Sequence, residues 1–192
     1  MEPITLTGRF VTLQPLSPAH LTGLQEAASD GELWNLFFTS VPKPEEMLQW
    51  IDATLSLQQK NEALPFVVFE NFSGKIVGTT RYCNLDTANR RMEIGYTWYA
   101  RRVQRSAINT ECKLLLLRHA FEQLKCIAVE FRTDWLNQIS QRAIERLGAK
   151  RDGILRNHKI MPDGRIRDSV VYSILNTEWN GIQKNLSLKL ER

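Results

Sequence analysis

The segment Met92-Glu-Ile-Gly-Tyr-Thr-Trp-Tyr99 decides the fold, together with the loop Ala100-Arg-Arg-Val-Gln-Arg-Ser-Ala107 that follows it. Apolar and polar side chains alternate in the first stretch, which predicts a strand over 91–99. The apolar spacing beyond the loop predicts a helix that begins near Asn109, with Asn109 or Thr110 as its N-cap. A helix N-terminus has unpaired N–H groups and partial positive charge, and the loop adds three arginines. The sequence therefore predicts an anion site, most naturally for a phosphate, at this loop.

Strand and helix patterns surround this segment. Residue spacing predicts strands over 8–15, 64–71, 75–85, 127–134, 154–161 and 167–175. It predicts helices over 18–28, 44–58, 109–124, 138–147 and 179–190, with Gly148 ending one of them in a left-handed conformation. Early hairpins followed by alternating strands and helices indicate a mixed α/β fold with helices on both faces of the sheet.

Bulk properties indicate an ordinary globular chain. Its 192 residues suit one domain over 1–192, and 43% of them are hydrophobic and 24% charged. No apolar run approaches the ~20 residues that span a bilayer, and the N-terminus has no signal-peptide pattern, so we expect a cytoplasmic protein. The net charge of +4 is mild, and a nucleic-acid partner is not needed to explain it. Cys83, Cys112 and Cys126 lie in apolar patterns without paired spacing, which predicts buried thiols and no metal site.

Further motifs follow the loop in a fixed order: Asn109-Thr-Glu-Cys-Lys113, Asn137 with Ser140, Ala143-Ile-Glu-Arg-Leu-Gly148 and Glu178-Trp179. Together they resemble the GCN5-related N-acetyltransferase superfamily, especially the branch that acetylates the N-terminal alanine of ribosomal proteins. The acetyl-coenzyme A loop of that family has the pattern Gln/Arg-x-x-Gly-x-Gly/Ala, which falls on Arg102-Val-Gln-Arg-Ser-Ala107. Arg105 stands where the family prefers a glycine, a residue that lets the backbone approach a pyrophosphate at unusual torsions.

The resemblance implies a mostly antiparallel central sheet in which the strands at 91–99 and 127–134 splay apart. The pantetheine arm of acetyl-coenzyme A, the co-substrate, is then expected in the gap. The implied cofactor-binding residues are Trp98, Arg102, Val103, Gln104, Arg105, Ser106, Ala107, Ile108, Asn109, Thr110 and Asn137. For the loop alone, a solvated basic turn is the alternative, and for Asn137 it is an ordinary helix N-cap.

Acetyl transfer to an amine needs a base, because a protonated amine has no lone pair. Glu93 is the best candidate, since a carboxylate on a central strand is seldom left there unless paired or functional. The alternative is a structural ion pair with Arg81 or Arg132. The resemblance places Ser140 near the thioester sulfur, where its hydroxyl would act as the acid, and a backbone N–H near a bulge after Tyr96 would polarise the thioester carbonyl.

Other candidates have a structural alternative. His158 and Tyr172 fall on the last two strands and could replace these acid–base groups or simply fill the core. The aromatic segment 34–38 is expected to wall the acceptor cleft or to cap the core. We expect an acetyl-coenzyme A-dependent N-acetyltransferase for a small-molecule amine or a protein N-terminus, with a homodimer left open. The alternatives are a non-catalytic acyl-coenzyme A-binding module and an enzyme for another acyl donor.

Overall fold

The computed structural model describes residues 2–191. Its strands are β1 (Leu6–Thr7), β2 (Val11–Pro15), β3 (Ala63–Glu70), β4 (Ile76–Asp86), β5 (Arg91–Tyr99), β6 (Ala128–Asp134), β7 (Lys150–Ile160) and β8 (Ile166–Leu175). Its α-helices are α1 (Leu21–Ser29), α2 (Met47–Gln59), α3 (Ala107–Arg118), α4 (Gln138–Glu145) and α5 (Trp179–Glu191). A π-helical turn, His119–Gln123, continues α3.

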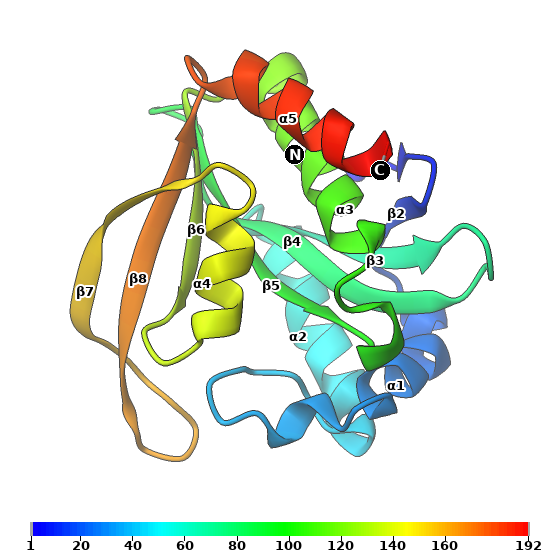
Figure 1. Cartoon of the computed structure of the whole chain (residues 1–192). Coiled ribbons are helices and arrows are strands. Elements are labelled where there is room, and N and C mark those ends of the chain that lie inside the picture. The colour runs from blue at the N-terminus through cyan, green and yellow to red at the C-terminus, as the bar shows by residue number, and fades with distance from the viewer. Residues whose placement is uncertain (1, 192) are drawn as a thin grey trace.

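The eight strands form one sheet in the order β1-β2-β3-β4-β5-β6-β8-β7 (Figure 1). Neighbouring strands are antiparallel except β5 and β6, which run parallel. The parallel pairing covers only Arg91–Glu93 of β5, and beyond Glu93 the two strands separate. The α/β class, the mostly antiparallel sheet and the splayed central strands are therefore confirmed.

Adjacent residues of β4 show how the helices are distributed over the sheet. The hydroxyl of Tyr82 donates to the carbonyl of Leu116 in α3 at 2.6 Å, whereas Arg81 donates to Thr54 in α2 at 3.2 Å. Because neighbouring side chains of a strand point to opposite faces, α2 and α3 cover opposite faces of the sheet. We call these the α2 face, which α1 also covers, and the α3 face, where α3 and α5 lie side by side (Figure 1).

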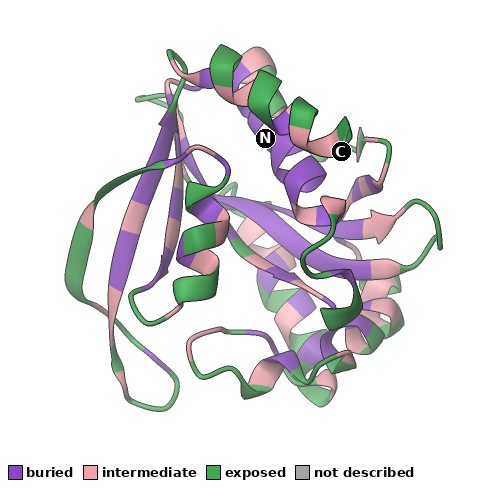
Figure 2. Ribbon diagram, in the orientation of Figure 1, coloured by how far each residue is buried: buried purple, intermediate pink, exposed green. Residues whose placement is uncertain are grey.

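The core lies on both faces of the central strands, which are buried along most of their length (Figure 2). Helix α3 is buried nearly all round, because α5 covers the side that faces away from the sheet. Its Glu111 is 6% exposed and accepts the backbone N–H groups of Arg9, Phe10 and Val11 at 2.6–2.8 Å. This carboxylate therefore ties the N-terminal hairpin to α3.

Two local expectations are wrong. Helix α3 begins at Ala107 rather than near Asn109, because the Ser106 hydroxyl accepts the N–H of Ile108 and caps the helix three to four residues before the predicted cap. Strand β7 begins at Lys150 and not at 154, since its pairing with β8 extends past an irregularity at Gly153.

Other expectations are confirmed. Gly148 has φ +101° after α4, and the three cysteines are buried and free. Within residues 2–191, no helix combines the length and hydrophobicity that crossing a membrane requires.

Candidate active site

The loop between β5 and α3 presents unpaired backbone N–H groups. The N–H groups of Val103 and Gln104 donate to carbonyls within the loop, and that of Ile108 donates to Ser106. Among the residues described, the N–H groups of Arg105 and Ser106 have no partner. Ala107 is the first residue of α3, so its N–H has no partner within the helix. The unpaired backbone N–H groups of the loop are therefore those of 105–107.

Arg105 has φ +63°, the left-handed conformation that glycine adopts freely. The arginine thus takes up the backbone shape of the family's glycine rather than changing the loop. Arg102 behaves differently, since its side chain lies 3.1 Å from Glu70 and 3.8 Å from Asp30. Arg105 and Arg101 have no ion-pair partner within the described part of the chain. The loop therefore holds two arginines without an ion pair among residues 2–191 and one, Arg102, whose partly exposed side chain lies near two carboxylates.

A β-bulge lies in β5 beside the opening between β5 and β6. Arg81 pairs with Gly95 and Thr79 pairs with Trp98, so that two residues of β5 oppose Thr80. Tyr96, in the bulge, has φ +52°. Gly78 of β4 permits the close approach, because a Cβ there would lie 2.1 Å from the carbonyl oxygen of Trp98.

The bulge breaks the alternation that the sequence predicts. Glu93 pairs with Cys83, which shares the α2 face with Arg81, so Glu93 points to that face. Tyr96 also points there, because its ring lies 4.0 Å below the guanidinium of Arg81. Glu93 and Tyr96 therefore lie on the same face of the sheet, although they are three positions apart. The regular alternation predicted from the sequence, which places them on different faces, is wrong here.

Glu93 lies at the last paired position before the strands separate, and it is 7% exposed. Asn84 donates to its Oε2 at 2.7 Å, and Nε of Arg132 lies 3.4 Å from the same oxygen. The ion pair is thus with Arg132 and not with Arg81. Burial raises the pKa of Glu93, against the opposing effects of Asn84 and Arg132. Its other oxygen, Oε1, lies beside Gly95, where a Cβ would come within 2.9 Å of it.

Helix α4 begins at the far side of the opening. The side chain of Asn137 accepts the N–H of Ser140 at 3.0 Å, which confirms it as the N-cap. Its amide NH₂ group and the Ser140 hydroxyl have no partner among residues 2–191. Trp98 is 9% exposed, and its indole N–H is buried without an acceptor in the same part of the chain.

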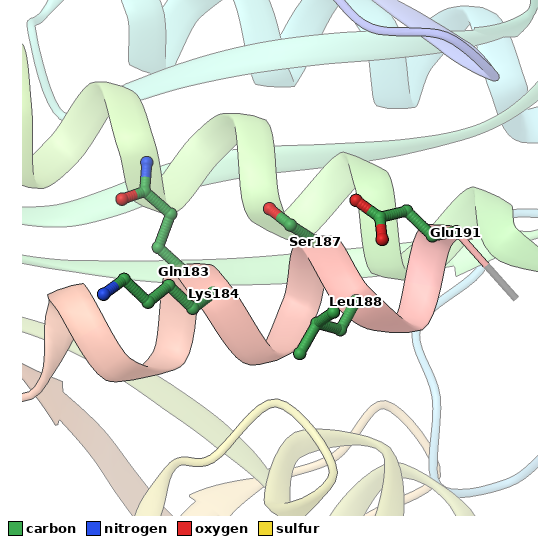
Figure 3. Close-up of a pocket in the computed structure, with 5 residues that line it drawn as sticks. All are labelled: Gln183, Lys184, Ser187, Leu188 and Glu191. Carbon is green, nitrogen blue, oxygen red and sulfur yellow. The ribbon is translucent and has the colours of Figure 1, made fainter.

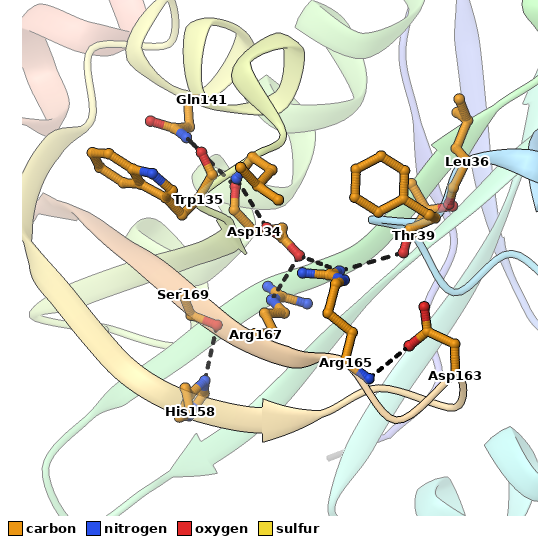
Figure 4. Close-up of polar contacts among 12 residues, drawn as sticks. Leu36, Thr39, Asp134, Trp135, Gln141, His158, Asp163, Arg165, Arg167 and Ser169 are labelled. Carbon is orange, nitrogen blue, oxygen red and sulfur yellow. Dashed lines mark hydrogen bonds and ion pairs between the residues drawn. The ribbon is translucent and has the colours of Figure 1, made fainter.

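A groove of about 550 Å³ borders the α2 face of this region. It is lined by segment 34–43, by Trp50 of α2 and by the turn between β7 and β8. Arg165 of that turn donates to the buried Asp134 at 2.7 Å and to the carbonyl of Phe37 at 3.4 Å (Figure 4). This arginine joins the end of β6, the β7–β8 turn and the aromatic segment into one wall. Phe37 is 55% exposed, so the segment is not simply a core cap.

The structure separates the two remaining candidates. Tyr172 is fully buried and donates to Glu145 at 2.9 Å, and burial raises its pKa to about 12, so it belongs to the core. His158 is half-buried and lies 2.9 Å from the Ser169 hydroxyl (Figure 4). Burial lowers the pKa of His158, with further effects of Lys159, Arg132 and Arg167.

Two buried cations were missed by the sequence analysis. Arg81 is 4% exposed between the rings of Trp50 and Tyr96. Lys113 of α3 is 5% exposed and donates to Thr97 at 2.6 Å and to Thr80 at 3.2 Å, behind the bulge. Burial lowers the pKa of Lys113 to about 8. The available signal was a charged residue within a predicted strand or helix of the core, directly before apolar residues, which is rare without a partner or a role.

A second hollow, of about 390 Å³, lies along α5 and is lined by Gln183, Lys184, Ser187, Leu188 and Glu191 (Figure 3). It is formed by one helix and lies away from the opening between β5 and β6 (Figure 1). Residues 2–191 contain no group of three or more His, Cys, Asp or Glu side chains placed to hold a metal ion. The opening, the loop and the groove are thus the candidate active site.

Comparisons with known proteins agree with this geometry. Residues 11–150 match the family described as Acetyltransferase (GNAT) domain, and the chain belongs to this family of N-acetyltransferases. The "Putative ribosomal N-acetyltransferase YdaF" of Bacillus subtilis (strain 168) is 34% identical over 110 residues, which is 57% of this chain and 59% of that protein. The match thus spans less than two thirds of that relative.

Solved structures share the fold over nearly the whole chain. A GCN5-related N-acetyltransferase from Brucella melitensis is 29% identical with a TM-score of 0.88, covering 99% of this chain and 86% of that one. The structure of Mycobacterium smegmatis RimJ in complex with CoA-disulfide has a TM-score of 0.83 at 19% identity, covering 98% of this chain and 97% of that one. At that identity, the second likeness concerns the fold alone.

Proposed function

We propose that this enzyme transfers the acetyl group of acetyl-coenzyme A to a primary amine by direct attack in a ternary complex. The carrying observation is the opening between β5 and β6, where paired strands end at Glu93 inside the sheet. Backbone N–H and C=O groups inside a protein need partners. The amide groups of an extended pantetheine arm would supply them, as an added strand does at a sheet edge.

The loop residues fit the other end of this co-substrate. The free N–H groups at 105–107 and the start of α3 would hold the pyrophosphate, with Arg105 and Arg101 adding charge-assisted contacts. The unused amide NH₂ of Asn137 would donate to the pantetheine arm. Membership of the GNAT acetyltransferase family supports acetyl-coenzyme A as the co-substrate.

The chemistry needs three protein functions. Oε1 of Glu93 would take a proton from the amine, directly or through water, while the amine nitrogen bonds to the thioester carbonyl carbon. A backbone N–H at the Tyr96 bulge would stabilise the negative charge that develops on the carbonyl oxygen. As the C–S bond breaks, its electron pair stays on sulfur, and the Ser140 hydroxyl would donate the proton that the resulting thiolate accepts. Glu93 then releases the amine proton to solvent, and solvent returns a proton to Ser140.

The acceptor would enter along the groove beside Phe37 and Trp50, on the face to which Glu93 points. A protein N-terminus is favoured by the likeness to YdaF, a relative described as a "putative ribosomal N-acetyltransferase". The organisation over 1–192 as one domain, the cytoplasmic location and the oligomeric state stay predictions.

Thermal unfolding with and without acetyl-coenzyme A tests the co-substrate, because a ligand that binds the folded state raises the melting temperature. The control is acetyl-pantetheine, which has the same thioester but no pyrophosphate and should stabilise far less. Release of free thiol on a panel of primary amines and N-terminal peptides then tests turnover. Stabilisation without thiol release on any amine or with any acyl donor would instead fit an acyl-coenzyme A-binding module. Equal shifts with both ligands would contradict the role of the loop.

A further inference from the structure

Two cations without a carboxylate partner meet at Tyr96, on the acceptor side of the bulge. The guanidinium carbon of Arg81, from β4, lies 4.0 Å from the centre of the Tyr96 ring, and Nζ of Lys159, from β7, lies 5.9 Å from it. Neither cation has an ion-pair partner among residues 2–191. Strands β4 and β7 lie on opposite sides of the opening in the sheet. Both charges therefore lie near the Tyr96 ring, and they come from strands on opposite sides of the opening.

Arg81 is the more unusual of the two, because its side chain is buried on the α2 face. It is 4% exposed, and only its Nη2 has a hydrogen-bond partner, Thr54, among the residues described. A buried charge without a counter-ion is costly. The rings of Tyr96 and Trp50 offset part of that cost through cation–π contacts, without supplying an anion.

The surroundings of Tyr96 and Glu93 add to this positive charge. Arg132 forms ion pairs with both Glu93 and Glu130, and Arg165 forms the shorter ion pair with Asp134, at 2.7 Å. Arg167 is left 4.0 Å from that carboxylate, and its buried Nε has no hydrogen-bond acceptor within residues 2–191. The cations in this region are Arg81, Arg91, Arg132, Lys159, Arg165 and Arg167, with Lys43 at the groove, and the carboxylates are Glu93, Glu130 and Asp134, with Glu46 and Asp163 at the groove. The acceptor side of the site therefore carries a surplus of positive charge.

We propose that the acceptor amine carries a carboxylate close to the reacting nitrogen, and that Arg81 and Lys159 bind this carboxylate beside Tyr96. The planar fork of an arginine suits a carboxylate, and the exposed Lys159 adds a mobile point charge. This inference rests on the proposed acetyl transfer and narrows its substrate class. The carboxylate is either the α-carboxylate of a free amino acid or the acidic side chain next to a peptide N-terminus.

Matched acceptor pairs test the proposal in a thiol-release assay. One pair is a free amino acid and its amide, and the other is a peptide with Asp or Asn as its second residue. For the acceptor class that the enzyme uses, the acceptor with the carboxylate should have a kcat/KM about 10- to 100-fold higher than its neutral counterpart. This is the range for a hydrogen bond to a charged group. In Arg81→Gln and Lys159→Gln, the ratio of kcat/KM between the two members of the pair should fall toward one.

The control variant is Lys150→Gln, which removes an exposed cation of β7 that is paired with Glu178. It should keep the wild-type ratio. Because Arg81→Gln removes a buried side chain, the surface variant Lys159→Gln tests the proposal even if Arg81→Gln does not fold. If the enzyme acetylates amines but the acceptors with and without the carboxylate have equal kcat/KM in both pairs, the inference is overturned and the proposed function stays intact. Absence of transfer to every amine overturns the proposed function itself.

Discussion

Replacing Glu93 with glutamine separates its proposed role as the base from its role in the ion pair with Arg132. Glutamine keeps the shape and the acceptor oxygen for Asn84, but it cannot take a proton. General-base catalysis contributes about 10²–10⁴-fold, so kcat should fall by that factor while the Kd for acetyl-coenzyme A is unchanged. This loss corresponds to about 3–5 kcal/mol of transition-state free energy.

The pH dependence follows from the pKa of Glu93, which burial raises above its usual range. The acidic limb of the wild-type pH–rate profile should therefore lie above the pKa of an ordinary glutamate, and it should vanish in Glu93→Gln. A raised pKa also means that the folded state favours the protonated carboxyl. The stability that this gives is present below the unfolded pKa and is lost as the pH rises through the folded pKa. Glu93→Gln, which mimics the neutral form, should therefore not lower the melting temperature at neutral pH.

Glu130→Gln is the matched control, because Glu130 pairs with Glu93 in the sheet and also binds Arg132. Its hydrogen bonds with Arg91 and Arg132 outweigh burial and lower the pKa of Glu130, so its stabilising effect is present at neutral pH and lost in acid. This control should lose about 1–2 kcal/mol of stability and keep most of kcat. Stopped assays over pH 5–9 and thermal unfolding of both variants supply the data. A Glu93→Gln enzyme with near-normal kcat and an unchanged acidic limb would refute the assignment.

Three further substitutions test the loop and helix α3. Because Arg105 contacts phosphate in our proposal, both Arg105→Gly and Arg105→Ala should weaken acetyl-coenzyme A binding by about 1–3 kcal/mol in calorimetry. Because Arg105 has φ +63°, only the glycine variant should raise the melting temperature of the free protein. A glycine variant that binds as tightly as wild type would contradict the phosphate contact. Glu111→Gln should lower the free energy of unfolding by about 2–4 kcal/mol in denaturant titrations, because three backbone N–H groups lose a charged acceptor. Burial lowers the pKa of Lys113 to about 8, so the protonated form is favoured in the unfolded chain and stability should rise between pH 8 and the unfolded pKa of 10.5. Lys113→Met should abolish that rise without lowering stability at pH 7, and a rise that persists would show that another group titrates.

Elements with a strong local signal could be predicted from the sequence. The strand–loop–helix order at 91–118 depends on local patterns, and so does the Asn137 cap. The family resemblance extended these patterns to the splay between β5 and β6, which the paired registers confirm. Local patterns were sufficient wherever the residues that determine an element lie within it.

The misses have a common physical origin in contacts between distant parts of the chain. The ion pairs of Arg102 with Glu70 and Asp30 could not be read from the basic loop around it, because both carboxylates are more than 30 residues away in the sequence. Glu111 fell inside an apolar helix with no local role, and its partners are about 100 residues earlier in the chain. A period-two pattern likewise contains no information on a bulge, which depends on how the neighbouring strand pairs.

The bulge at Tyr96 is the feature from which most of the proposed chemistry follows. A regular strand would place Glu93 and Tyr96 on opposite faces, with Tyr96 against α3. The extra residue turns Tyr96 toward Arg81 and the groove, and it leaves Thr97 against Lys113 on the α3 face. The bulge thus brings Glu93, the candidate base, to the same face as Tyr96, the ring that contacts Arg81 and Lys159. Both lie beside the backbone where the thioester would bind. Since the bulge is held by Gly78 on one side and by Lys113 on the other, its geometry depends on the fold around it and not on the ligand. This arrangement favours a site that is formed before either substrate binds.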